Sequence, residues 1–337
     1  MDHLWDLARP TTSAALLVDL AREHGVGLDR CLARTGIDLK ALRNPSTEIA
    51  ARQELVLVEN LVSALGDVAG LGLEAGTRYH ATTHGLWGFA VLSSPSSRKA
   101  LQVAINYLEL TCSFSRVRVE NQANDVRLVV DDARVPSEVR RFLLERDLSG
   151  FVTIRKEMFG AAAPMERIDI KYSAPDYADL YERYLGIAPN FEVGANAVTL
   201  AAELLDHPLP QANPMTAELC EQQCAQLLDQ RRRRLGTSGQ VRTALVERGI
   251  KAGLADVADT MHISERTLRR RLEIEGTSFR ELFVETFETV ADELLGAGLT
   301  VEDVSERLGY SSAASFTHAF KQWKGTTPGR FARAIRL

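Results

Sequence analysis

The sequence predicts a two-domain protein in which an α+β domain precedes an all-α domain. Its 337 residues exceed what one compact core usually needs. A hairpin-like pattern is confined to the first part of the chain, and a repeated pair of short helices occupies the last part. With 45% hydrophobic and 25% charged residues, the composition excludes collagen-like, low-complexity and wholly disordered chains.

The first domain is expected to begin with helices and to continue with strands and helices. Residues 10–110 have the spacing of a series of helices, clearest in 55–65 and 101–108. Segments 112–120 and 125–130 flank a polar turn, which predicts a hairpin. The pattern then predicts a helix over 137–159, a strand over 167–172, a helix over 175–185 and short strands over 191–193 and 197–200. Too few strands are visible for a β-barrel, so we expect an α+β domain.

A proline cluster at Pro208, Pro210 and Pro214 marks the linker. A helix over about 215–235 follows it and ends in four arginines, after which residues 236–239 read as a flexible break. The sequence therefore divides into a regulatory domain at 1–205, a linker with its connector helix at 206–239, and a second domain at 240–337.

The charge differs between the two parts of the chain. The net charge of −5, taken alone, argues against a nucleic-acid-binding protein. Residues 1–230, however, hold 22 basic and 31 acidic residues, a net of −9, whereas residues 231–337 hold 18 and 14, a net of +4. Arginines gather at 231–234 and 269–271, an arrangement suited to binding phosphates.

The basic part contains two segments that match each other, 254–279 and 301–328. Each predicts a short helix, a turn and a capped second helix, which is the helix-turn-helix pattern. The first helices share an apolar pair four residues apart, Ser264 or Ser311 is the expected N-cap, and the second helices bury another such pair. The buried pairs are Val257 and Met261, Leu268 and Leu272, Val304 and Leu308, and Phe316 and Phe320. A helix near 279–295 joins the two units.

In this motif the second helix enters the major groove of DNA. Arg266 and Arg270 point away from buried Leu268, and their guanidinium groups can donate two hydrogen bonds to guanine. Around Phe316 the corresponding side chains are Ala314 and His318, so the first reading helix is expected to discriminate sequence more than the second. The predicted DNA-contacting residues are Ser264, Arg266, Thr267, Arg269, Arg270, Arg271, Ser312, Ala314, Ser315, Thr317, His318 and Lys321, with Lys324 as a further phosphate contact.

The region 241–336 resembles the DNA-binding domain of the AraC/XylS family of transcription regulators. The motif that carries the resemblance is Gly309-Tyr310-Ser311, followed by Phe316, Phe320, Lys321, Trp323, Gly325, Thr327 and Pro328. Residues 84–95, continued by Ala100 and Leu101, are similar to the effector-domain signature of the subgroup that contains the ornithine-utilisation and VirS regulators. The resemblance implies a ligand-responsive regulator, expected to be an activator, whose partners are promoter DNA, RNA polymerase and a small effector. The connector helix is a candidate for pairing two copies.

One segment departs from the family. The helix between the two units often carries basic residues near its start, whereas residues 285–289 here are acidic. This places phosphate contacts from that helix in doubt.

The effector site is expected around His84, Trp87 and Phe89, with Tyr107 or Phe114 nearby. Aromatic residues at such spacing more often form a core, and they do not identify a ligand. His80 and His84 stand four residues apart, yet no carboxylate or cysteine stands beside them, so no metal site is expected. The cysteines at 31, 112, 220 and 224 are expected to be reduced thiols.

An alternative is a bifunctional regulator whose first domain is enzymatic, as in relatives fused to an alkyl transferase or an amidotransferase-like domain. Those activities need a reactive cysteine, and Cys112 has neither a metal cluster nor a nucleophile elbow around it. We therefore expect no catalytic residue and no cofactor. The longest uncharged stretch, 81–97, is too polar to span a membrane, and the acidic N-terminus is unlike a secretory signal, so the protein is expected in the cytoplasm.

Overall fold

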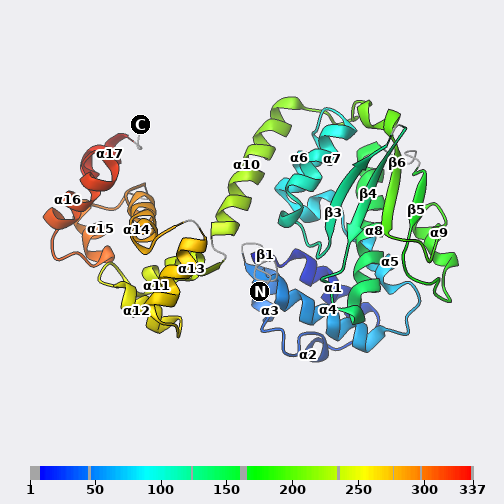
Figure 1. Ribbon diagram of the computed structural model, residues 1–337, viewed down its shortest axis with the longest axis horizontal. Coiled ribbons are helices and arrows are strands. Elements are labelled where there is room, and N and C mark those ends of the chain that lie inside the picture. Colours follow the sequence, from blue (N-terminus) through cyan, green and yellow to red (C-terminus); the bar gives the residue numbers. More distant parts are fainter. Residues whose placement is uncertain are drawn as a thin grey trace. The chain divides into compact units, whose positions relative to one another are not determined.

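The computed structural model describes residues 8–44, 47–122, 124–159, 165–233, 236–275, 277–296 and 298–334. Residue contacts divide the chain into two compact units, one ending at Asp229 and the other starting at Gln230. The first unit is α+β and the second contains only helices among its described residues, as Figure 1 shows, so the predicted fold class is confirmed. Within the described ranges no helix is both long and apolar enough to cross a membrane.

The first unit begins with a helical layer. Its elements are β1 (Ala8–Pro10), α1 (Thr12–Glu23), α2 (Leu28–Cys31), α3 (Leu39–Arg43), β2 (Glu48–Ala50) and α4 (Ala51–Leu65). The short strands β1 and β2 pair antiparallel. Leu17 and Leu20 of α1 pack with Leu57 and Leu61 of α4, all fully buried, so the apolar faces of these two helices form the core of the layer.

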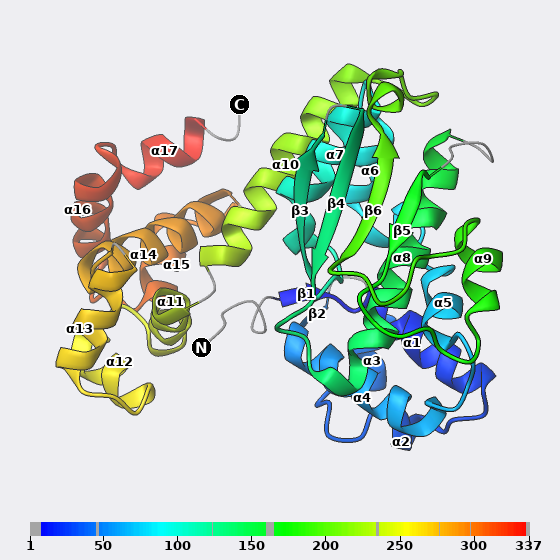
Figure 2. The ribbon, with the colours of Figure 1, turned by 45° about the vertical axis from the view of Figure 1, so that its right-hand side comes forward.

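A four-stranded antiparallel sheet forms the centre of the first unit, in the order β3-β4-β6-β5 (Figure 2). The strands are β3 (Arg116–Asn121), β4 (Asp125–Asp131), β5 (Arg167–Asp169) and β6 (Asn196–Ala201). Helix α8 (Ser137–Phe159), confirmed with the predicted bounds, packs Leu144 and Leu148 against Leu128 and Val198 of the sheet. The apolar faces of α8 and of the sheet therefore enclose a second core.

Helix α5 (Leu71–Gly76) approaches α8 unusually closely. A Cβ atom at Gly72 would lie 2.6 Å from the Phe142 carbonyl oxygen, and one at Gly76 would lie 2.4 Å from the Arg146 carbonyl oxygen. Only glycine permits this approach, which brings Tyr79 against α8. The remaining elements of the unit are η2 (Ala81–His84), α6 (Leu86–Leu92), α7 (Ser97–Asn106), η3 (Leu108–Leu110), α9 (Asp179–Leu185), η4 (Ala202–Asp206) and α10 (Pro214–Arg233).

Several predicted boundaries in the first unit are wrong. The strand expected from residue 112 begins at Arg116, because the Ser113 and Ser115 amides donate to the hydroxyls of Thr111 and Ser113 in a turn. The strand over 167–172 ends at Asp169, and the helix over 175–185 begins at Asp179. Residues 191–193 form no strand, since Glu192 has a φ of 58° and Phe191 packs on Tyr181.

The predicted break at 236–239 is also wrong, because Gly236 begins helix α11 (Gly236–Arg248). The Glu275 carboxylate accepts the amides of Thr237 and Ser238 at 2.7 and 2.9 Å. These amides belong to the first turn of α11, where no carbonyl of the helix can accept them, so Glu275 stabilises the start of the helix.

The second unit contains the two predicted helix pairs around one core. Its further helices are α12 (Leu254–Thr260), α13 (Glu265–Ile274), α14 (Phe279–Gly296), α15 (Val301–Leu308), α16 (Ala313–Lys324) and α17 (Pro328–Ala334). Leu268 and Leu272 of α13 and Phe316 and Phe320 of α16 are buried in that core, as predicted. Both helix-turn-helix units are therefore present.

The turns of the two units differ by one residue. After the first helix of each unit the backbone is left-handed, at His262 with a φ of 53° and at Gly309 with a φ of 85°. Ser264 caps α13 as predicted, but Ser312, not Ser311, caps α16. Val304 to Phe316 spans one residue more than Val257 to Leu268, which moves the cap along by one position.

Candidate nucleic-acid interface and effector cavity

Helix α13 presents arginines to solvent. The Ser264 hydroxyl accepts the Thr267 amide at 3.2 Å and fixes the start of the helix, and buried Leu268 fixes which side faces the core. Arg266, Arg269, Arg270 and Arg271 are all exposed. Arg269 lies 3.4 Å from Glu265 one turn earlier, whereas no ion pair within the described chain involves Arg266 or Arg270. Two guanidinium groups one turn apart are thus available on the face opposite the core.

Helix α16 presents fewer hydrogen-bond donors. The Ser312 hydroxyl accepts the Ser315 amide at 3.2 Å and lies 3.0 Å from the Ser315 hydroxyl, so both predicted contacts take part in the N-cap. Ala314, His318 and Lys321 are exposed, and Thr317 is half-buried. This helix offers a methyl group and an imidazole where α13 offers two guanidinium groups.

Two other predicted phosphate contacts are engaged within the protein. The Lys324 ammonium lies 2.7 Å from both Glu288 and Asp292 of α14, and hydrogen bonds to these carboxylates raise its pKa. Arg231, from the first arginine cluster, is only 3% exposed. Lys324 is therefore engaged with α14 and Arg231 is buried, and the phosphate contacts expected of both stay predictions. The side chain of Arg233 and all of Arg234 lie outside the described residues.

The acidic residues of α14 are partly neutralised by these and other ion pairs. Glu285 accepts a hydrogen bond from Arg242 of α11 at 2.8 Å, and Glu288 pairs with Lys324 as described. The predicted acidic helix therefore binds basic residues of its own domain, and its carboxylates hold α11 and α16 against α14.

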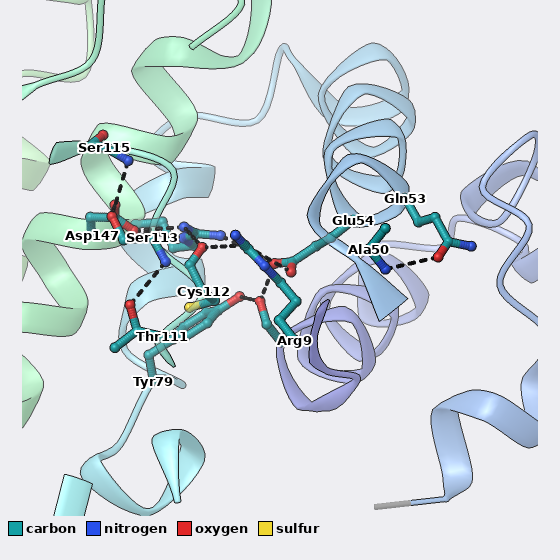
Figure 3. A network of polar contacts seen from close by, with 12 residues as sticks. Arg9, Ala50, Gln53, Glu54, Tyr79, Thr111, Cys112, Ser113, Ser115 and Asp147 are labelled. Carbon is teal, nitrogen blue, oxygen red and sulfur yellow. Dashed lines mark hydrogen bonds and ion pairs between the residues drawn. The ribbon is translucent and has the colours of Figure 1, made fainter. Parts of the chain in front are cut away.

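The first unit contains a buried polar network that joins four of its segments (Figure 3). Arg9, from β1, donates to the Cys112 carbonyl oxygen at 2.9 Å and lies 3.3 Å from Glu54 of α4. Arg146, from α8, donates to the same carbonyl at 3.0 Å and to Asp147 at 2.8 Å. Arg9, Glu54 and Arg146 are at most 5% exposed. The two arginines and the two carboxylates balance one another, which makes their burial tolerable.

A cavity of about 200 Å³ lies between the sheet and helices α7 and α8, next to this network. Most of its wall is apolar, built by the strands, by α7 and by α8. The apolar lining includes Trp87, Val91, Leu101, Ala104, Ile105, Val117, Leu128, Val130, Leu144, Leu148, Phe151, Ile154, Val198 and Leu200. The lining residues with polar groups are Tyr79, His84, Ser97, Thr111, Cys112, Ser113, Arg146, Asp147 and Arg155. A mainly apolar cavity with few polar groups is typical of a small-molecule site.

Two of the three predicted effector residues line the cavity. The His84 ring lies 5.1 Å from the Trp87 ring and 6.2 Å from the Tyr79 ring, between centroids. Trp87 donates its indole N–H to the Ala104 carbonyl oxygen at 3.1 Å. Phe89, in contrast, is 53% exposed and does not line the cavity, because it follows Trp87 by two residues and faces the opposite side of α6.

The other residues expected near the effector lie elsewhere. Neither Tyr107 nor Phe114 lines the cavity, and Phe114 instead packs 4.4 Å from the Arg9 guanidinium group. Sequence reasoning missed Arg146 and Arg155, which lie in a helix rich in arginine and glutamate and so resemble surface residues. The sequence around such an arginine does not show that it is buried, because the glycines that it faces belong to another helix.

His80 and His84 do not come together. His80 lies 2.5 Å from Glu157 of α8, so the expectation that no carboxylate stands near this pair is wrong, whereas His84 faces the cavity. The described residues hold no group of three potential metal ligands. All four cysteines are free and buried, and burial raises the pKa of Cys112 to about 11.

Burial and the positive charge of Arg146 lower the pKa of His84 to about 4, so its imidazole is neutral at neutral pH. Below pH 6.5 the unfolded chain takes up a proton at this histidine and the folded chain does not, which favours unfolding. We expect His84 to cost up to about 3 kcal/mol of stability as the pH falls from 6.5 to 4. The free energy of unfolding of His84→Phe, measured over this range, should fall less than that of the parent chain. Parallel curves would contradict the expectation.

Comparison with known proteins agrees with this architecture. The model of the arabinose-binding domain found at the N-terminus of AraC transcription regulators matches residues 25–209, and a helix-turn-helix domain model matches residues 257–334. The first match covers more than half of the chain. The fold and the two helix pairs define a DNA-binding transcription regulator, and the chain belongs to the AraC family.

Several known proteins are similar to this chain over nearly its whole length. An uncharacterised HTH-type transcriptional regulator of Mycobacterium tuberculosis, Rv1395, is 35% identical over 334 residues, covering 97% of each chain. The ornithine utilization regulator of Pseudomonas aeruginosa is 29% identical over 338 residues, covering 96% of each. The crystal structure of the regulator CdpR from Pseudomonas aeruginosa aligns with a TM-score of 0.50 at 24% identity, over 96% of this chain and 98% of that one, so the fold is shared.

Proposed function

We propose that the protein is a ligand-responsive transcription activator that reads two adjacent major-groove segments of promoter DNA with α13 and α16. The exposed arginine pair opposite Leu268 is the observation that carries this proposal. The effector domain spans 1–205 and the DNA-binding domain 240–337, joined by the linker and connector at 206–239. The protein acts where promoter DNA and RNA polymerase are, in the cytoplasm.

The two reading helices divide the recognition unequally. Arg266 and Arg270 donate to guanine edges, and Arg269 and Arg271 contact bases or phosphates. Ala314 and His318 read the second segment, where a methyl group favours thymine. The remaining proposed contacts, Ser264, Thr267, Ser312, Ser315, Thr317 and Lys321, position the helices on the backbone.

Helix α10 offers a route for effector control, since it packs on residues of the cavity wall and its last residues belong to the second unit. Cys224 and Leu228 of α10 share a core with Trp87 and Ile154, which line the cavity. A ligand that moves these two side chains changes the packing of α10. Met215 and Leu219, which are 84% and 56% exposed on the same helix, are candidates for pairing with a second copy. Arabinose, which the family description names, and ornithine, which one relative's name mentions, are reference molecules for testing the chemical class of the effector.

We propose no enzymatic activity for this protein. The alternative, a bifunctional regulator with alkyl-transfer or amidase-like activity, requires a reactive nucleophile in the first domain. Burial keeps the Cys112 thiol protonated, which opposes such a role. Stoichiometric alkylation of a cysteine by alkylated DNA would overturn this part of the proposal.

The proposed interface predicts a strong salt dependence of DNA binding. Contacts from about five exposed basic side chains release a similar number of counterions, so affinity is expected to fall about a hundred-fold or more between 50 and 200 mM salt. Lys321→Ala should reduce the slope of log affinity against log salt by about one and weaken all sequences equally. Fluorescence anisotropy with labelled duplexes measures both. An affinity that is flat over this range would contradict the interface.

A further inference from the structure

The wall of the cavity limits what it can bind. A pentose such as arabinose carries several hydroxyl groups, each of which needs a hydrogen-bond partner when it leaves water. The wall offers few, since the strands, α7 and most of the α8 surface contribute leucine, valine, isoleucine, alanine and phenylalanine. A zwitterion such as ornithine needs compensating charges at both of its ends. The cavity therefore favours a largely apolar molecule.

The polar end of the cavity lies beside the buried network and carries donors without partners. Nη1 of Arg146 is buried and makes no hydrogen bond, although Glu54 lies 3.7 Å from it. The Ser97 hydroxyl is also buried without a hydrogen bond, but it lies at the other end of the cavity, since the Ser97 amide donates to the His207 carbonyl oxygen beyond β6. No hydrogen bond of the His84 ring is found in the part of the chain that the structure describes, and His84 lines the same cavity. Unpaired buried polar groups on the wall indicate that a ligand supplies their partners.

The charge at this end is already balanced. Arg9 and Arg146 are matched by Glu54 and Asp147 within 3.3 and 2.8 Å, and His84 is neutral. The Cys112 thiol and the Tyr79 phenol are also uncharged, because burial raises the pKa of each. A ligand carboxylate placed here would add one uncompensated negative charge to a buried site, which is costly. A neutral hydrogen-bonding group would add no charge to the site.

The dimensions agree with a small elongated ligand. Arg146 and Arg155, which both line the cavity from α8, are nine residues apart, or about 14 Å along the helix axis. Leu148, Phe151 and Ile154 lie between them. An apolar cavity of about 150 Å³ holds benzene, so 200 Å³ holds roughly eight to ten non-hydrogen atoms.

We propose that the cavity binds an uncharged, largely aliphatic molecule that carries one polar head, such as an amide or ketone, placed against Arg146 and His84. This inference deepens the proposed function by giving the chemical class of the effector, and it rests on that function only for the regulatory consequence. Binding itself can be measured without DNA.

A panel of four small molecules of nearly equal size tests the class. Octanamide, octanoate, arabinose and ornithine are added to the full-length chain at pH 7, and affinity is measured by calorimetry and by the shift of the unfolding midpoint. Octanamide is expected to bind, octanoate at least about 30-fold more weakly, and the two polar molecules not at all at the same concentration. Tighter binding of octanoate, binding of arabinose or ornithine, or no binding of octanamide would each overturn the proposal.

Two variants locate the ligand. His84→Phe keeps an aromatic ring between Tyr79 and Trp87 but removes the nitrogens, so octanamide should bind about 3- to 10-fold more weakly while butylbenzene binds unchanged. Leu101→Trp fills the cavity and should abolish binding of both. Val246→Trp, at an exposed position on α11 in the second unit, is the control and should bind like the parent chain. Unchanged octanamide binding by Leu101→Trp would exclude this cavity.

The regulatory consequence is measured separately. Octanamide is added to the chain bound to promoter DNA, and the DNA affinity is compared with that in its absence. Binding of octanamide without any change in DNA affinity would leave the ligand class standing and contradict effector control. A change of DNA affinity caused by arabinose or ornithine would support effector control and overturn the ligand class.

Discussion

Replacing Arg146 with methionine is expected to lower the free energy of unfolding of the first unit by about 3–5 kcal/mol. The guanidinium group is 1% exposed, donates to Asp147 and to the Cys112 carbonyl, and lies 5.3 Å from the Tyr79 ring. Methionine fills the volume but leaves Asp147 and Glu54 with one positive charge fewer. Urea unfolding followed by tryptophan fluorescence measures the loss. In a Trp323→Phe background, Trp87, which is buried in the first unit, reports on this loss.

A double-mutant cycle separates the charge from the packing. Asp147→Asn removes the carboxylate that Arg146 pairs with at 2.8 Å. If the pair is coupled, Asp147→Asn costs less in the Arg146→Met background than in the parent chain. Additive losses, or a loss below about 1 kcal/mol for Arg146→Met, would show that the network does not stabilise the fold.

Replacing Arg270 with alanine is expected to weaken binding to the cognate promoter by about 5- to 150-fold, equivalent to 1–3 kcal/mol. The arginine is exposed, on the face of α13 opposite Leu268, where a bidentate contact with guanine is possible. His318→Ala, at the exposed face of α16, should cost less. Binding to promoter DNA and to unrelated DNA is compared for each variant. A larger loss for His318→Ala than for Arg270→Ala would reverse the assignment of the two helices.

The DNA-binding unit could be predicted almost completely from the sequence. Its helices are amphipathic and its contacts are local, so the spacing of Val257, Leu268, Val304 and Phe316 determines both the helices and their buried faces. Two predictions were wrong. Ser311 in place of Ser312 came from assuming equal turns in the two units, and the break expected at 236–239 is the start of α11. The ion pairs of Lys324 with α14 could not be predicted, because they depend on how helices distant in sequence pack.

The effector cavity was only partly predictable. His84 and Trp87 lie in a recognisable motif, but Arg146 is one of several arginines in α8 and acquires its role only because Gly72 and Gly76 allow α5 to approach. The charge balance that favours a neutral ligand depends on Arg9 and Glu54, which are far from Arg146 in sequence. Long-range packing, which a single sequence does not display, assembles this site.

The central claim, that α13 and α16 read two adjacent DNA segments unequally, is tested most directly by selecting binding sites from a randomised duplex library. The full-length chain, Arg270→Ala and His318→Ala are compared. The parent chain is expected to select two elements about 10–10.5 base pairs apart, one of them rich in guanine. Arg270→Ala is expected to lose the guanine preference and keep the other element. Selection of a single element by the parent chain, or retention of the guanine preference by Arg270→Ala, would contradict the account.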